Sequence, residues 1–347
     1  MKITYLFRNE KTGFSIEGIF SGLMEEMRLQ SMYRITAVKM RYVSSSLRSI
    51  YENLKQARGV SSDVYHITGD NNYLALATPS DRTVLTILDS IILVRTWADR
   101  QYFRFAFFWL LYYFWPIWKA GIVTAISEKS KEDLVQFIGR RLASKIVVVP
   151  CFYDPVLKPA PQPFNTVDPI ILHIGTPPHK NLLRLIAALK GVRCRLDIVA
   201  ELTDEARDAL RTNNIVYTQS QRLSQADIIR KYQDCDLVAF VSTYEGFGMP
   251  IIEGNAIGRP VLTSNLSPMR EVAGAGACLI DPFDVQSIRE GVLRICEDDT
   301  YREQLIQRGF ENARRFTRNQ IAQEYDLLYK QIGERNRSRM PEVKMEN

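Results

Sequence analysis

The stretch STYEGFGMPIIEGNAIGRPVLTS, from Ser242 to Ser264, indicates the fold class of the chain. The apolar run LVAFVS (237–242) leads into it, a glycine-rich turn follows at 245–248, and Pro250 opens a helical pattern that ends before the next apolar run. Proline suits the first turn of a helix, and glycine lets backbone amides approach a ligand closely. The pattern predicts a strand, a turn, a helix and a second strand, which is the repeating unit of parallel α/β sheets.

Two glutamates frame this turn. Glu245 lies in the turn, and Glu253 lies eight residues later in the predicted helix. Open α/β sheets bind ligands at the carboxyl ends of their strands, so we expect both carboxylates at a ligand-binding edge. Two glutamates at this separation are common by chance, but two that flank a glycine-rich strand-to-helix turn are not.

A second stretch, HIGTPPHKNLLRLIAAL (173–189), predicts another strand, turn and helix. Lys180 stands where the helix is expected to begin, and there the helix dipole and free amide groups already favour an anion. Taken alone, the stretch is also explained by an ordinary turn with a surface lysine.

Apolar runs and helical patterns alternate along both halves of the chain, which predicts two α/β domains with parallel sheets. Strands are expected at 3–7, 35–40, 64–68, 83–88, 122–127 and 146–150, and again at 170–175, 194–200, 214–218, 236–242, 259–264 and 277–282; helices in the first half are expected at 16–29, 45–58 and 128–142. We expect a first domain over 1–157 and a second over 158–318, which begins with the proline-rich linker KPAPQPFNTVDP (158–169). A helix over 319–333 and a disordered polar tail over 334–347 complete the organisation.

The composition is that of a globular protein, with 46% hydrophobic and 24% charged residues. The five cysteines are scattered, with no Cys-x-x-Cys pair, which argues against a zinc site or a disulfide framework and fits a reducing compartment. The opening MKITYLF resembles a strand and shows no secretory signal, so we expect a cytoplasmic protein.

The excess positive charge lies in the first half, where residues 1–150 hold 20 basic and 13 acidic side chains. The same half contains FAFFWLLYYFWPIW (105–118), an uncharged run flanked by Arg100, Arg104 and Lys119. One interpretation is a buried helix. The other is that 100–119 contacts an anionic membrane surface, with aromatic rings at headgroup depth and cations beside them, on the inner face of the cytoplasmic membrane. No nucleic-acid-binding motif accompanies the basic charge, so we expect no nucleic acid partner.

The motifs resemble one family. EGFGMPIIE (245–253) is similar to the E-x7-E motif of the retaining GT-B glycosyltransferases of family 4, and GTPPHKNL (175–182) is similar to their phosphate-binding lysine segment. The later stretches SNLSPMREVAGAGACLIDPFD and QLIQRGFENARRFT also resemble the family, and the first half does so more loosely, for example in DVYHITG (63–69). The resemblance implies two Rossmann-like domains facing across a cleft, the first binding an acceptor and the second a nucleotide sugar, with the helix over 319–333 returning to the first domain.

The resemblance also implies a role for individual residues of the donor site. Glu253 would hold the ribose hydroxyls, Glu245 the transferred sugar, and Lys180 the diphosphate leaving group. The backbone amides of Phe247, Gly248 and Met249 would approach the sugar and the diphosphate, and Arg222 and Leu223 would contact the base.

The sequence departs from the family pattern in three places. Thr176 and His179 stand where the family often has arginine, so these two donor-binding positions imply a weaker phosphate clamp or one supplied elsewhere. Leu88-Asp89 replaces a His-Asp pair, which leaves Asp89 as a catalytic candidate without its imidazole, and His66 cannot be assumed to replace it. Arg270 stands where proline is usual.

The implied reaction is transfer of a hexosyl group from a GDP- or UDP-sugar to a saccharide or polyprenyl-linked saccharide, with retention of configuration, in lipopolysaccharide or O-antigen synthesis. No cofactor and no metal are expected, because Lys180 would neutralise the leaving group. Asp234-Cys235-Asp236 imitates a metal-binding Asp-x-Asp motif, but its place between a helix and a strand favours a role in the turn. A non-catalytic nucleotide-sugar-binding subunit and a GT-B sugar-nucleotide epimerase remain as alternatives.

Overall fold

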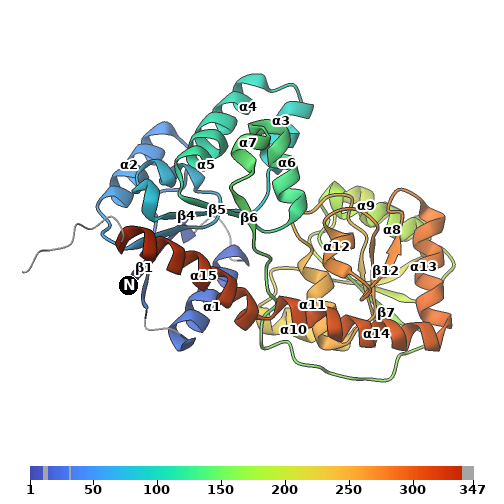
Figure 1. Ribbon diagram of the computed structural model, residues 1–347. Helices are drawn as coiled ribbons and strands as arrows, with labels where there is room; N and C mark the ends of the chain where they lie inside the picture. Colours follow the sequence, from blue (N-terminus) through green and yellow to red (C-terminus); the bar gives the residue numbers. More distant parts are fainter. Residues whose placement is uncertain (11–14, 31–32, 338–347) are drawn as a thin grey trace, which may run out of the picture. The chain divides into compact units, whose positions relative to one another are not determined.

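The computed structural model describes residues 1–10, 15–30 and 33–337. They form two compact units, each built around a parallel six-stranded sheet (Figure 1). The first unit consists of Met1–Cys151 together with the last helix, α15 (Arg318–Arg337), and the second of Phe152–Thr317. The alternation of strands and helices predicted from the sequence is confirmed in both units.

The first sheet has the strand order β2-β1-β3-β4-β5-β6, with every pair parallel. Its strands are β1 (Lys2–Phe7), β2 (Arg34–Lys39), β3 (Val64–Ile67), β4 (Thr83–Ile87), β5 (Ile122–Ala125) and β6 (Ile146–Val148). Strands β3, β4 and β5 are buried along their whole length, as expected for a sheet covered on both faces.

The helices predicted over 16–29, 45–58 and 128–142 are present near those ranges, and the first unit has further helices that were not predicted. Before α15, the helices of this unit are α1 (Ser15–Gln30), α2 (Leu47–Arg58), η2 (Asn72–Leu76), η3 (Ser80–Arg82), α3 (Ile91–Ala98), α4 (Tyr102–Phe108), the π-helix η4 (Trp109–Phe114), α5 (Trp115–Lys119), α6 (Glu128–Ile138) and α7 (Arg140–Ala143). The helix predicted over 128–142 is divided, because Gly139 takes φ +79° between α6 and α7.

The second sheet has the order β12-β11-β10-β7-β8-β9, again with parallel pairs. Its strands are β7 (Ile170–Ile174), β8 (Arg195–Val199), β9 (Val216–Ser220), β10 (Leu237–Phe240), β11 (Val261–Ser264) and β12 (Cys278–Ile280). The helices are η5 (Pro178–Lys180), α8 (Leu182–Ala188), α9 (Asp204–Thr212), α10 (Gln225–Asp234), α11 (Met249–Ile257), α12 (Met269–Ala273), α13 (Val285–Glu297), α14 (Asp299–Ala313) and η6 (Arg314–Phe316).

The proline-rich stretch 158–169 is part of the second unit and not a free linker. Ala160 donates its amide to the Ile257 carbonyl at 3.0 Å, and the Gln162 side chain donates to the Cys235 carbonyl at 2.9 Å. The stretch lacks helical or strand periodicity, yet these hydrogen bonds hold it against the second unit. The division between the units accordingly falls at 151/152.

Helix α15 belongs to the first unit, where it lies beside α1 (Figure 1). The Tyr329 hydroxyl contacts the Tyr5 hydroxyl at 2.8 Å and His66 Nδ1 at 2.5 Å, and all three side chains are buried. The helix continues through Arg337, so the polar tail expected from Glu334 does not begin there. Glu and Arg are good helix formers and extend a helix already held by its buried residues; positions 338–347 lie outside the described residues.

Candidate active site

The second sheet reverses its strand order between β7 and β10. From β7 the chain builds outward through β8 to β9, and then places β10 on the other side of β7. Strands β7 and β10 are paired neighbours, with Ile171 opposite Leu237. The loops that follow two such strands diverge and leave room for a ligand at the carboxyl edge of the sheet. These loops carry Lys180 and Glu245, so the topology brings the two sequence motifs together.

The loop after β7 positions Lys180. Gly175 takes φ +99°, and a Cβ built on it would lie 2.9 Å from Lys180 Cγ, so glycine lets the lysine stem cross the backbone here. Asn181 follows Lys180 with φ +65°. Its side-chain amide donates to the carbonyls of Val241 and Pro282, at 3.0 and 2.7 Å. These bonds fix the loop to the segments that follow β10 and β12.

Lys180 and Glu245 form an ion pair. Lys180 Nζ donates to Glu245 Oε1 at 2.6 Å, and the side chains are 20% and 15% exposed. The same ammonium lies 5.0 Å from the centre of the Phe240 ring. Lys180 ends η5 instead of starting a helix as predicted, and α8 has only seven residues. Anion binding at this loop therefore depends on the lysine charge more than on a helix dipole.

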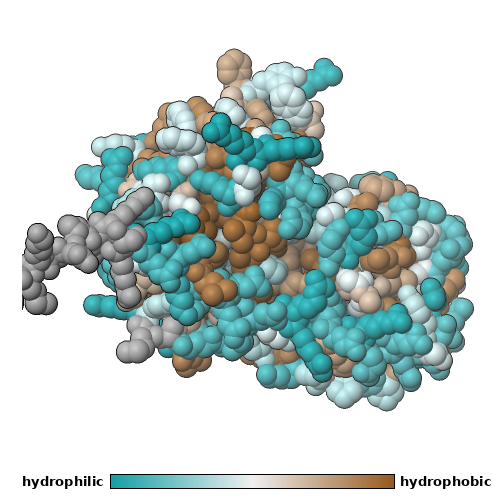
Figure 2. All heavy atoms as spheres, in the orientation of Figure 1, coloured by the Kyte–Doolittle hydropathy of each residue, from teal (hydrophilic) through white to brown (hydrophobic). Residues whose placement is uncertain are grey.

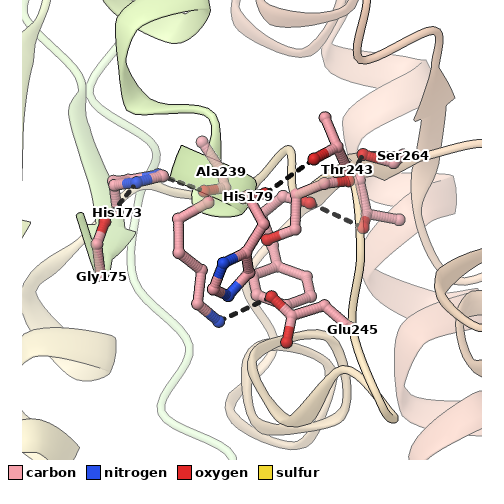
Figure 3. Close-up of polar contacts among 11 residues, drawn as sticks. His173, Gly175, His179, Ala239, Thr243, Glu245 and Ser264 are labelled. Carbon is pink, nitrogen blue, oxygen red and sulfur yellow. Dashed lines mark hydrogen bonds and ion pairs between the residues drawn. The ribbon is translucent and has the colours of Figure 1, made fainter. Parts of the chain in front are cut away.

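His173 holds the carboxyl ends of β7 and β10 in place (Figure 3). Its Nδ1 lies 3.1 Å from the Ala239 carbonyl oxygen and its Nε2 lies 2.9 Å from that of Gly175. Burial lowers the pKa of His173 to about 4, so the ring is neutral and donates through one nitrogen at a time. His173 is thus a structural residue beneath the ion pair.

Thr176 and His179 contribute backbone contacts to the loop. The His179 carbonyl accepts the Thr243 amide at 2.7 Å, which ties the lysine loop to the glutamate loop (Figure 3). The Thr176 hydroxyl donates to the Glu201 carbonyl at 2.8 Å. Both side chains are half-buried. They lie in the loop expected for donor binding, and the Thr176 hydroxyl is engaged with the backbone.

The glycine-rich turn at 245–248 leads into α11 and buries the side chain of Phe247. Gly248 takes φ +123° immediately before α11, and the Phe247 ring is buried with its centre 5.7 Å from that of Phe316. The first amides of an α-helix have no partner inside the helix. The amides of Gly248 and Met249 can consequently donate to a ligand at this edge.

Glu253 lies on α11 beyond this turn. Its Oε2 accepts the Tyr232 hydroxyl at 2.5 Å, and Tyr232 is a fully buried residue of α10. Burial raises the pKa of Glu253 above its ordinary value, and the hydrogen bond from Tyr232 lowers it in part. The bond holds one carboxylate oxygen and leaves the other for a second donor.

The loop before α10 carries Arg222 and Leu223. Arg222 is exposed with φ +54°, and Leu223 is half-buried. Farther along, the Asp236 carboxylate accepts the amides of Asn165 and Ile170, at 2.9 and 2.8 Å. The predicted structural role of the Asp-Cys-Asp triplet is confirmed, since Asp236 is buried at the amino end of β10. Over the described ranges, no group of three or more His, Cys, Asp or Glu could hold a metal ion.

Asp89 lies in the first unit, after β4. Its Oδ1 accepts the Ile91 amide at 3.0 Å and its carbonyl accepts the Tyr113 hydroxyl at 3.1 Å, so it caps the start of α3. His66 is fully buried in the core, where burial lowers its pKa to about 3. His66 Nε2 lies 2.7 Å from the Thr86 hydroxyl, so the ring is engaged within the core.

The first sheet also has a switch point, between β1 and β3. Four polar side chains follow β3 and β4 at that carboxyl edge, at most 5% exposed, and each has an atom without a hydrogen-bond partner among the described residues: Thr68 Oγ1, Asn71 Nδ2, Asn72 Oδ1 and Ser90 Oγ. We call these four residues the polar edge of the first unit. Buried polar groups normally find partners in the protein or in ordered water, so this cluster is a polar part of the edge whose hydrogen bonds the described residues do not complete.

Sequence reasoning missed the polar edge, Tyr232 and Asn181. The only available signal for the polar edge was TGDNN (68–72), a polar run directly after a buried strand. Ser242 was also missed; its buried hydroxyl, at the end of β10, has no partner among the residues that the structure describes. Tyr232 lies in an ordinary amphipathic helix, and only the packing of α10 against α11 reveals its contact with Glu253.

Comparisons with known proteins agree with this geometry. Residues 157–312 match the family model described as glycosyl transferases group 1. O-antigen chain mannosyltransferase B of Escherichia coli is 36% identical over 91 residues, which are 26% of this chain and 24% of that protein. The chain therefore spans about a quarter of the length of this curated relative.

Two solved structures share the fold along almost the whole chain. Sucrose-phosphate synthase from Thermosynechococcus elongatus has a TM-score of 0.76 at 17% identity, covering 96% of this chain and 100% of that one. Anabaena HepE, solved in complex with UDP and glucose, has a TM-score of 0.75 at 18% identity, covering 95% and 99%. The two parallel sheets and these likenesses show the GT-B fold. Within the second unit, residues 157–312 are similar to the group 1 glycosyltransferases, and the resemblance to family 4 is consistent with this.

Proposed function

We propose that the chain is a retaining hexosyltransferase that uses a GDP- or UDP-sugar as donor and a saccharide as acceptor. The observation that carries the proposal is the Lys180–Glu245 ion pair at the β7/β10 switch point, beside the start of α11. A cation, a carboxylate and free helix amides at one sheet edge suit a ligand with a diphosphate at one end and sugar hydroxyls at the other.

The donor is held through its diphosphate and ribose. Lys180 turns from Glu245 toward the diphosphate, with the amides of Gly248 and Met249 as further donors. Glu253 accepts the ribose hydroxyls at the oxygen that Tyr232 leaves available. Glu245, released from Lys180, accepts a hydroxyl of the transferred sugar. The base lies toward Arg222 and Leu223.

The reaction breaks the bond between the anomeric carbon and the diphosphate oxygen. The acceptor hydroxyl bonds to the anomeric carbon on the same face, and its proton passes to the leaving diphosphate oxygen. Lys180 stabilises the charge that develops on the diphosphate, so no divalent ion is required. Departure and attack on one face retain the configuration and need no protein nucleophile.

The acceptor is bound by the polar edge of the first unit. Its amides and hydroxyls are neutral donors and acceptors, which suit sugar hydroxyls better than a phosphate. Asp89 lies at the same edge, after β4, and serves as the catalytic candidate on the acceptor side. The name of the Escherichia coli relative supports a saccharide of surface-polysaccharide or O-antigen synthesis as acceptor, and we propose that it is polyprenyl-linked and glycosylated at the inner face of the cytoplasmic membrane.

The test has two stages. Thermal unfolding is first measured with a panel of UDP- and GDP-sugars, because a donor that binds the folded state raises the melting temperature. The donor that stabilises the protein is then incubated with saccharide acceptors, and products are followed by mass spectrometry and by the NMR coupling of the new anomeric proton. We expect an α-linked product from an α-linked donor. Donor binding without transfer or hydrolysis would instead identify a non-catalytic binding subunit.

A further inference from the structure

The segment α3 to α5 of the first unit carries an exposed aromatic surface. Six side chains make up this aromatic face, with exposed fractions of 96% for Phe103, 67% for Trp118, 56% for Tyr102, 55% for Trp97, 44% for Trp115 and 37% for Phe107. At the top of the view in Figure 2, over α4, tan and white residues lie beside teal ones.

The opposite side of the same segment is packed into the core of the unit. Tyr112, Tyr113, Pro116 and Ile117 are buried, and the Trp109 indole donates to the Phe137 carbonyl at 2.8 Å. The interpretation as a buried helix is thus confirmed for one side of the segment, and the interpretation as a membrane-contacting surface stays a prediction for the other side. A helix that is apolar on all sides is normally covered on all sides. The exposed side therefore has the character of a binding surface.

Arginines surround the aromatic face. Arg95, Arg100 and Arg104 are exposed on the segment, and Arg140 and Arg141 are exposed on α7, which follows the α6 end that packs against α4 through Phe137 and Phe105. None of these five forms an ion pair with another residue in the described ranges. The segment 91–119 holds one acidic residue, Asp99. The surface thus combines large aromatic rings with unpaired cations.

We propose that the aromatic face and its arginines dock the first unit on the surface of an anionic lipid bilayer. Tryptophan and tyrosine favour the headgroup level, phenylalanine reaches the acyl boundary, and arginine is attracted by anionic lipid. A second copy of this chain fits the surface poorly, because a symmetric contact would oppose the arginines of both copies. Over the described residues no helix is long and apolar enough to cross a membrane, so the contact is interfacial.

The tryptophans provide a direct readout. All four tryptophans of the chain, Trp97, Trp109, Trp115 and Trp118, lie in this segment, so intrinsic fluorescence reports on it alone. We expect vesicles of phosphatidylglycerol and phosphatidylcholine to blue-shift the emission at low salt, and bromine-labelled lipids to quench it. Pure phosphatidylcholine vesicles should bind much more weakly, and salt should weaken the binding to anionic vesicles.

Variants separate the two contributions in sedimentation with vesicles. Arg100→Gln with Arg104→Gln should weaken anionic binding about fivefold for each arginine removed. Phe103→Ser with Trp118→Ser should abolish sedimentation and leave the circular dichroism and melting temperature unchanged, because both side chains are exposed. Tyr217→Ser with Phe283→Ser removes two exposed rings from the second unit and should sediment as wild type.

Three results would overturn the proposal. The proposal is wrong if wild-type protein stays in solution when anionic vesicles are sedimented at low salt. Equal binding to neutral and anionic vesicles would show that the arginines are not responsible for binding. An equal loss of vesicle binding in Tyr217→Ser with Phe283→Ser would show that the aromatic face is not responsible. Concentration-dependent dimers in sedimentation velocity that disappear in Phe103→Ser with Trp118→Ser, without vesicle binding, assign the surface to a second copy instead.

Discussion

The carboxyl edges of the two sheets have the same topology and different chemistry. In the second unit the edge carries charges that already have partners, Lys180 with Glu245 and Glu253 with Tyr232. In the first unit the edge carries Asp89 and the Arg8–Asp70 ion pair, together with hydroxyls and amides that are buried without partners among the described residues. A charged ligand can displace an ion pair, whereas a hydroxylated ligand can complete an unsatisfied network. The contrast is the basis for assigning the donor to one edge and the acceptor to the other.

The largest expected effect comes from removing the cation of the second edge. Lys180→Ala should lower kcat by about 100- to 1000-fold, because the charge on the leaving diphosphate loses its main stabilising group. Lys190→Ala, at an exposed lysine just after α8, is the matched control and should be unaffected. Steady-state kinetics with both substrates measures this, and near-normal turnover in Lys180→Ala would remove the second edge from the reaction.

Glu253 should affect donor binding more than turnover. Glu253→Gln loses a charge-assisted hydrogen bond worth about 1.5–3 kcal/mol, so the Kd for the donor should rise by roughly 10- to 100-fold. Titration calorimetry measures the change. Tyr232→Phe leaves the carboxylate in place and should have a smaller effect; an equal or larger one would make the Tyr232 contact the decisive feature.

The raised pKa of Glu253 also predicts a pH dependence of stability. The folded state keeps a proton that the unfolded chain loses near the ordinary value of 4.5, so this residue's contribution to the free energy of unfolding falls as pH rises through its folded pKa. Glu253→Gln lacks this titration. Urea unfolding is measured from the ordinary pKa of 4.5 upward through the folded pKa. The free energy of unfolding of the variant should rise relative to that of wild type as pH rises, and a difference that stays constant with pH would contradict the raised pKa.

At the polar edge of the first unit, a substitution should raise stability and weaken acceptor binding. Thr68→Val removes a buried hydroxyl without a partner, so the free energy of unfolding should rise by about 1 kcal/mol, while the KM for the acceptor rises a few-fold and donor affinity stays constant. Thr86→Val is the control, because the Thr86 hydroxyl contacts His66 and Thr124 at 2.7 Å. That variant should lose stability. A destabilised Thr68→Val would mean that the hydroxyl has a partner in solution.

The smallest expected effect is that of removing divalent ions. Because Lys180 supplies the positive charge at the leaving group, EDTA should leave the rate unchanged, and added Mg²⁺ or Mn²⁺ should not raise it. A rate that falls with EDTA and returns with either ion would contradict the role given to Lys180.

The sequence predicted the elements and the second edge well, for a physical reason. Strand periodicity, the glycines of the turn and the positions of Lys180, Glu245 and Glu253 are local patterns, and parallel topology then places Lys180 beside Glu245. Contacts that arise from tertiary packing could not be predicted from the sequence. Nothing local marks Tyr232 as the partner of Glu253, or Thr68 and Ser90 as buried at the same edge of the sheet. The aromatic segment needed the structure as well, since aromatic residues occur on both its buried and its exposed sides.

The position of α15 has a consequence for the order in which the protein is made. The second unit is continuous in sequence, but the first is assembled from residues near both ends of the chain. During synthesis, Tyr5 and His66 emerge from the ribosome hundreds of residues before Tyr329, their hydrogen-bond partner. Domains fold as units during synthesis, so we infer that the second unit is complete first. The first unit keeps an open face on its sheet until the last helix is released.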